Sequence, residues 1–316
     1  MTPPLFVLGV SRSGTTLLRV ILDRSPGIAI PDETFFIPQL AHRHSGLVDP
    51  EKFLDDIRRL PRLAAWGVSS EDFAARLRPG MSVGEALDAV FSAYAAKHGK
   101  PRWGDKTPMY MRHLGIIQRL FPDAQYVHLI RDGRDAALAF LDMPEGVVTK
   151  TWAHPRSPTG FACEWRTEVR RARELGRRLG PSRYLEVRYE DLVADTAGAV
   201  QSVCDFAGLS FEPAMLEYAG AVDVSAKPHH QRLLQPPTRG LRDWRTQMER
   251  GDALAFEAIA GDLLAELGYE LLEPAAGGRM RVLPLLWYRV RMGAWNAASH
   301  AMQRSPLWRR RHPHLL

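Results

Sequence analysis

The stretch LFVLGVSRSGTTLLRVILD, residues 5–23, constrains the fold of this 316-residue chain more than any other segment. The apolar run Leu5–Gly9 predicts a buried strand, and Thr15–Arg24 predicts the helix that follows it. The loop between them has the spacing of a phosphate-binding loop (P-loop), G-x-x-x-x-G-K-[ST], except that Thr15 replaces the lysine. Backbone N–H groups of such a loop, together with a helix N-terminus, bind an oxyanion. The stretch therefore predicts an anion site whose ligand does not need the loop lysine.

Further strand and helix patterns predict an α/β fold. Residues 124–130 (AQYVHLI) and 183–189 (RYLEVRY) indicate two more strands, and residues 142–158 and 221–240 indicate loops. Helices are expected over 34–99 with breaks, and over Asp132–Phe140, Thr159–Leu179 and Ala253–Leu267. Alternating strands and helices favour a P-loop-type parallel sheet flanked by helices, with helical insertions. Ligands of such sheets bind beyond the C-terminal strand ends, where the first loop and RDGRD (131–135) would meet.

The charge is unevenly distributed, which suggests a domain over 1–273 and a basic extension over 274–316. The extension contains eight Arg and no Asp, Glu or Lys, so its net charge is +8. The net charge of the whole chain is +6, so residues 1–273 together carry −2. A general nucleic-acid-binding face on the body is therefore not expected.

The same composition argues for a cytoplasmic protein without a metal. No apolar run reaches the roughly 18 residues of a membrane span. The first strand starts almost at the N-terminus, which leaves no room for a signal peptide. The two cysteines form no disulfide framework, and no His/Cys cluster has ligand spacing.

Four segments together resemble the P-loop sulfotransferases that use 3′-phosphoadenosine 5′-phosphosulfate (PAPS). They are SRSGTT, YVHLIRDGRDAALAF, VRYEDL and TRGLRDW, in the family order, and the resemblance spans about residues 5–268. RSGTTLLRVILDRSPGIAIPDET, DKTP and RLFPDAQYVHLIRDGR are most similar to tyrosylprotein sulfotransferases and their bacterial relatives. The resemblance implies transfer of a sulfuryl group from PAPS to a hydroxyl, which gives a sulfate ester and the product PAP.

The resemblance also implies donor-binding residues. The loop residues would surround the 5′-phosphosulfate, and Arg131 would bind the 3′-phosphate, because a guanidinium suits a dianion. Tyr189 of the Y-E-D motif would contact adenine, although a core tyrosine at a strand end is the alternative. The full donor set is Arg12, Ser13, Gly14, Thr15, Thr16, Arg131, Tyr189, Arg239 and Gly240.

Three residues are expected to act in catalysis. Glu33 matches the family's general base, which takes the proton of the acceptor hydroxyl, with Asp32 as the fallback. Lys106 and Arg12 would stabilise charge on the transferring sulfuryl group. From the residues alone, Glu33 in PDET could instead cap a helix, and Lys106 in GDKTP could be a surface lysine.

Two positions depart from the family pattern. Ala139 stands where the family usually has serine eight residues after Arg131, so one hydrogen bond to the 3′-phosphate should be missing. Leu17 stands where many relatives have an aromatic residue that stacks on adenine.

Several alternatives remain open from the sequence. The acceptor is a hydroxyl-bearing small molecule, lipid, glycan or peptide. A small-molecule kinase and a catalytically silent nucleotide-binding relative are the competing functions. Residues 279–316 mix Arg with Leu, Trp and Tyr, which fits either contact with an anionic membrane surface or a helix packed on the body through its aromatic face. A disordered or peptide-binding extension is a third alternative.

Overall fold

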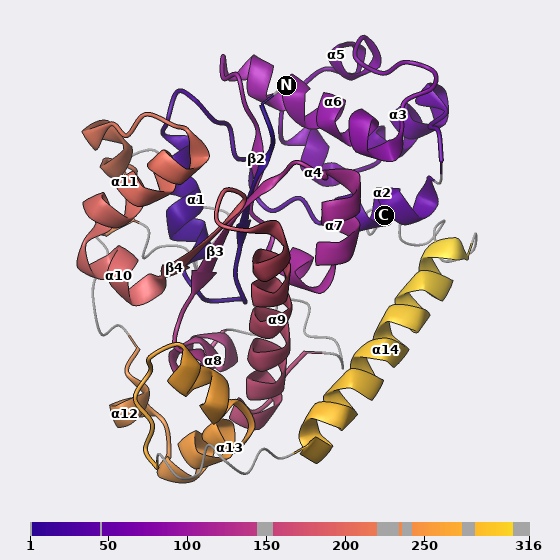
Figure 1. Cartoon of the computed structure of the whole chain (residues 1–316). Helices are drawn as coiled ribbons and strands as arrows, with labels where there is room; N and C mark the ends of the chain where they lie inside the picture. The colour runs from indigo at the N-terminus through magenta and orange to yellow at the C-terminus, as the bar shows by residue number, and fades with distance from the viewer. Residues whose placement is uncertain are drawn as a thin grey trace.

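The computed structural model describes residues 2–44, 46–143, 154–219, 234–235, 242–273 and 282–305 (Figure 1). Its sheet has four parallel strands in the order β2-β1-β3-β4. Their bounds are β1 Leu5–Leu8, β2 Gly104–Asp105, β3 Gln125–Ile130 and β4 Tyr184–Arg188. The three predicted strands and the predicted α/β class are confirmed, whereas the two-residue strand β2 was not predicted.

The central strand β1 is apolar throughout because both faces of the sheet are covered. Leu5 and Val7 belong to a core cluster that contains residues of α1 (Thr15–Asp23) and α11 (Thr196–Ala207). Phe6 and Leu8 belong to a larger cluster on the opposite face. Alternate residues of a strand point to opposite faces, so a sheet buried on both sides needs a continuous apolar run.

The helices form a layer on each side of the sheet (Figure 1). α1, α10 and α11 lie on one side, and α9 lies on the other, where it packs against α13. The insertion predicted over 34–99 is helical, and it forms α2 to α6. The bounds are α2 Ile37–Arg43, α3 Pro50–Arg58, α4 Pro61–Ala64, α5 Ser70–Ala74, α6 Val83–Lys97, α7 Leu114–Leu120, α8 Gly133–Leu141, α9 Pro158–Leu179, α10 Tyr189–Ala194, α11 Thr196–Ala207, α12 Trp244–Gln247, α13 Arg250–Glu266 and α14 Val282–Arg304, with 3-10 turns η1 Pro108–Arg112 and η2 Pro213–Leu216.

The remaining sequence predictions differ in outcome. The helices expected over 15–24, 132–140, 159–179 and 253–267 are confirmed as α1, α8, α9 and α13, with small shifts at their ends. Most residues of the two loops expected over 142–158 and 221–240 lie outside the described residues. The division at residues 273 and 274 stays a prediction.

The basic extension contains a long helix, α14, that packs against α9 and α13 and runs along the outside of the molecule (Figure 1). Tyr288 and Met292 are buried in the larger core cluster. Trp287, one position before Tyr288, is 66% exposed. Only part of the apolar surface of α14 therefore packs on the body.

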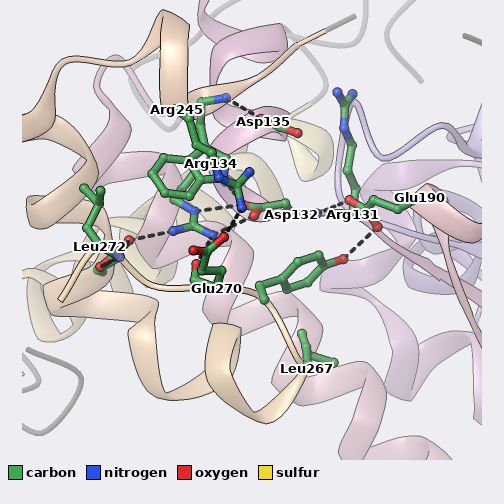
Figure 2. Close-up of polar contacts among 12 residues, drawn as sticks. Arg131, Asp132, Arg134, Asp135, Glu190, Arg245, Leu267, Glu270 and Leu272 are labelled. Atoms are coloured by element: carbon green, nitrogen blue, oxygen red, sulfur yellow. Dashed lines mark hydrogen bonds and ion pairs between the residues drawn. The ribbon is translucent and has the colours of Figure 1, made fainter. Parts of the chain in front are cut away.

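A buried arginine joins the end of β3 to the C-terminal part of the domain. Arg134, fully buried at the start of α8, donates hydrogen bonds to Asp132 (2.7 Å) and to Glu257 of α13 (2.6 Å). It also donates to the backbone oxygen of Glu270 (Figure 2). The Cζ atom of Arg134 lies 3.6 Å from the ring centroid of Trp244. This cluster fixes the backbone directly after Arg131.

We predict that Arg134→Ala lowers the free energy of unfolding by about 3–5 kcal/mol, because it leaves the buried carboxylates of Asp132 and Glu257 without their cation. The matched control is Arg245→Ala, which removes a half-exposed arginine that pairs with the exposed Glu270. The control should cost about 1 kcal/mol or less. Urea unfolding measures both, and equal losses would contradict the role assigned to Arg134.

Candidate active site

Each of the four strands places a predicted site residue at its C-terminal end. The P-loop follows β1, Lys106 follows β2, Arg131 follows β3 and Tyr189 follows β4. The strands are parallel and hydrogen-bonded in register, so these ends lie along one edge of the sheet. The chain thus assembles the site where α/β proteins bind their ligands.

The P-loop adopts a conformation that depends on glycine. Gly14 has φ +88°, and a Cβ atom there would overlap the ring of Tyr189. Arg12 also has a positive φ, +71°, which is uncommon for a residue with a side chain. The Ser13 N–H donates to the backbone oxygen of Val10 (3.1 Å), which closes the turn.

Helix α1 begins at Thr15 directly after this turn. Within the described part of the chain, no side chain caps its N-terminus, and its first turn contains no acidic residue. The backbone N–H groups at Thr15 and Thr16 and the positive end of the helix dipole are therefore suited to an anionic ligand.

A lysine directly after β2 lies at the N-terminus of α1. Lys106 is fully buried, forms an ion pair with Glu33, and donates to the hydroxyl of Thr16 (3.1 Å). Burial lowers the pKa of Lys106, and the Glu33 carboxylate opposes that effect. The two predicted catalytic side chains are thus in direct contact at the N-terminus of α1.

A buried network fixes the backbone on both sides of this ion pair. The Thr34 hydroxyl donates to Asp105 (2.7 Å), and the Thr34 N–H donates to the hydroxyl of Thr107 (3.0 Å). Thr34 follows Glu33, and Asp105 and Thr107 flank Lys106. The network therefore holds two segments more than seventy residues apart in a fixed relation.

Asp105 is a positioning residue that the sequence reasoning missed. Burial raises its pKa to about 7, against the hydrogen bonds from Thr34 and Thr107. Among the described residues, its Oδ1 atom has no hydrogen-bond partner. The available signal was an acid directly before the predicted lysine in GDKTP.

Arg131 connects the P-loop to the end of β4. Its Nη1 donates to the backbone oxygen of Arg12 (3.1 Å), and its guanidinium lies 4.6 Å from the ring centroid of Tyr189. The side chain points away from the Arg134 cluster (Figure 2). Its buried Nε has no hydrogen-bond partner among the residues that the structure describes, so a donor is available for a phosphate. This arrangement fits the predicted 3′-phosphate site.

The departures from the family pattern lie in the two helices that follow the P-loop and Arg131. Ala139 lies buried in α8 and has no hydroxyl to offer, and Leu17 is buried in α1. Arg239 and Gly240 fall outside the described residues. The described end of TRGLRDW contacts α8, because the backbone N–H of Trp244 donates to the Asp135 carboxylate (2.8 Å).

Comparison with known proteins identifies the class of this fold and site. Residues 3–213 match the model of the "Sulfotransferase family", and the chain belongs to that family. It is 26% identical to protein-tyrosine sulfotransferase 2 of Gallus gallus over 282 residues, 85% of this chain and 70% of that protein. It is 31% identical to the nodulation protein NoeE of Sinorhizobium fredii over 290 residues, 84% of this chain and 65% of that protein.

A solved structure supports the fold. The sulfotransferase domain from the curacin biosynthetic pathway matches with a TM-score of 0.59 at 21% identity, over 86% of this chain and 99% of that one. The predicted enzyme class, a PAPS-dependent sulfotransferase, is confirmed by the family. Family membership also decides against the kinase alternative.

We predict that Asp105→Asn changes how stability depends on pH. The folded-state pKa of about 7 lies above the ordinary value of 3.8, so the native state holds a proton that the unfolded chain releases. Stability from this group is present below about pH 4 and is lost as the pH rises through about 7. The stability of Asp105→Asn relative to the wild type should therefore increase across this range.

Urea unfolding at several pH values measures this difference. The matched control is Asp123→Asn, which changes an exposed aspartate after α7. A constant difference between Asp105→Asn and the wild type from pH 4 to pH 7 would contradict the assignment.

Proposed function

We propose that this enzyme sulfates a hydroxyl group with Glu33 as the general base and with Lys106 and Arg12 as the cations at the transferring group. One observation carries the proposal: Lys106 and Glu33 are in contact at the N-terminus of α1, beside the hydroxyl of Thr16. A base and a cation at one anion-binding helix end are the groups that sulfuryl transfer to a hydroxyl requires.

The proposed reaction is a single displacement. The acceptor oxygen forms a bond to sulfur while the bond from sulfur to the bridging phosphate oxygen breaks, and PAP departs with that electron pair. The acceptor proton moves to a Glu33 carboxylate oxygen. The N–H groups at Thr15 and Thr16, with Arg12 and Lys106, stabilise negative charge on the sulfuryl and bridging oxygens.

The Lys106–Glu33 ion pair suggests how the base becomes available. Burial lowers the pKa of Lys106, and contact with the Glu33 carboxylate works against that effect. We propose that an anionic donor competes with Glu33 for this cation, which leaves the Glu33 carboxylate able to accept a proton. The Thr34–Asp105–Thr107 network keeps both backbones in place during the exchange.

We assign the 3′-phosphate to Arg131 and a place beside adenine to Tyr189, with Arg239 and Gly240 as further donor contacts from the resemblance. The stacking of Arg131 on Tyr189 against Gly14 supports a common donor site. Because Ala139 lacks a hydroxyl, we expect weaker discrimination in favour of the 3′-phosphate than a serine would give.

The side chains around Glu33 are candidates for contact with the acceptor. Arg62 donates to the backbone oxygen of Glu33 (2.8 Å), and its guanidinium lies 4.3 Å from the ring centroid of Phe35. Phe35 has φ +61°, a strained backbone for a bulky residue, and such strain is concentrated at functional sites. We propose that Phe35 and Arg62 border the acceptor hydroxyl. A peptide tyrosine, as the name of the Gallus gallus relative suggests, is one candidate beside small molecules, lipids and glycans.

We propose that the protein is cytoplasmic, as the sequence predicts. The two cysteines, Cys163 and Cys204, are buried and free, which supports a reducing compartment.

We predict that Glu33→Gln lowers kcat by about 10²- to 10⁴-fold, because it removes the proton acceptor. PAP binding should persist, since Arg131 and the P-loop are unchanged. The assay follows label from radiolabelled PAPS to whichever member of a panel (a phenol, a primary alcohol, a sugar) the wild type sulfates fastest.

The matched control is Asp32→Asn, which changes the neighbouring exposed acid. It should keep the wild-type rate within about twofold, because the contact between Glu33 and Lys106 is unchanged in this variant. Full activity of Glu33→Gln, or an equal loss in Asp32→Asn, would overturn the assignment of Glu33.

A further inference from the structure

Helix α14 exposes a continuous apolar face. Among the described residues, seven large hydrophobic side chains are exposed, and five of them lie on this helix. Four of the five have the spacing i, i+3, i+4 and i+7, which places them on one side of a helix. We call these four residues the α14 stripe: Leu283 (79% exposed), Leu286 (55%), Trp287 (66%) and Val290 (55%).

The α14 stripe is not the face that packs on the body. Tyr288 and Met292 are buried in the core cluster, and Leu285 and Trp295 are partly buried against it. The helix is therefore already anchored to α9 and α13 by other residues. A helix with two apolar faces, one of them anchored, presents the second to a partner.

The charge of the segment that contains the stripe selects an anionic partner. The segment 274–316 carries eight arginines and no acidic residue, whereas the rest of the chain has the opposite sign. Arg289 is exposed on α14 between Trp287 and Val290. A second copy of this chain would bring two segments of charge +8 together, so repulsion opposes self-association.

An anionic lipid surface matches both the exposed apolar stripe and the positive charge of the segment. Exposed Leu, Trp and Val side chains enter the boundary between headgroups and acyl chains, while arginines contact the lipid phosphates. Within the part of the chain that the structure describes, no helix is long and apolar enough to span a bilayer, so α14 would lie in the plane of the surface.

We propose that the α14 stripe and Arg289, aided by the net charge of +8 on residues 274–316, bind the enzyme to an anionic membrane surface. The inference rests on exposed side chains and charge alone, so its test does not depend on the sulfation reaction.

The test is sedimentation of the full chain with vesicles of phosphatidylcholine and phosphatidylserine, and with vesicles of phosphatidylcholine alone. We expect the wild type to bind the anionic vesicles, and added salt to weaken that binding. The double variant Leu286→Ser/Trp287→Ser should bind them at least about tenfold more weakly. The matched control Leu47→Ser, at a 71% exposed apolar residue outside α14, should bind as the wild type does.

Four results would overturn the proposal: no binding to anionic vesicles, equal binding to both kinds of vesicle, wild-type binding by the double variant, or an equal loss in Leu47→Ser. If the wild type does not bind vesicles but forms a dimer by light scattering, and the double variant is monomeric, the stripe is instead a contact with a second copy of the chain. Because both changes affect exposed residues, unchanged PAP binding checks that the variants are folded.

Discussion

The common direction of the four strands is the constraint on which the rest of the structure depends. β1 pairs in parallel with both β2 and β3, and β3 pairs in parallel with β4. The C-terminal ends of all four strands therefore lie along the same edge of the sheet. Each end contributes one part of the site: the anion-binding loop, a lysine, an arginine and an aromatic ring. The P-loop has no lysine of its own, but Lys106, directly after the neighbouring strand β2, reaches the hydroxyl of Thr16 at the N-terminus of α1.

The buried charged side chains at this edge of the sheet are arranged around one ion pair. A lysine with no solvent exposure needs a counter-charge, and Glu33 supplies it. The acid beside that lysine, Asp105, is buried without a cation of its own, and burial raises its pKa. The same ion pair joins both proposed catalytic side chains, and the Glu33 carboxylate opposes the lowering of the Lys106 pKa by burial.

The sequence predicts the parts of this design that have a local signature. The apolar run Leu5–Gly9 and the glycine spacing after it identified β1 and the P-loop, because burial and turn geometry restrict those residue types. Strand β2 has two residues and no periodic pattern, since it is defined only by pairing with Leu5 and Phe6. The contact of Glu33 with Lys106 and the burial of Arg134 between Asp132 and Glu257 join distant segments, so local patterns could not reveal them. The exposure of Trp287 beside the buried Tyr288 likewise depends on how α14 meets α9.

The central claim is that this edge of the sheet binds a phosphosulfate donor. Calorimetric titration of the enzyme with PAP, ADP and ATP–Mg²⁺ tests this claim most directly. We predict that PAP binds at least about tenfold more tightly than ATP–Mg²⁺, because the site supplies its cation through Lys106 and offers Arg131 to a 3′-phosphate. In Arg131→Ala, the preference for PAP over ADP, which lacks the 3′-phosphate, should shrink. Tighter binding of ATP–Mg²⁺ than of PAP would contradict the account.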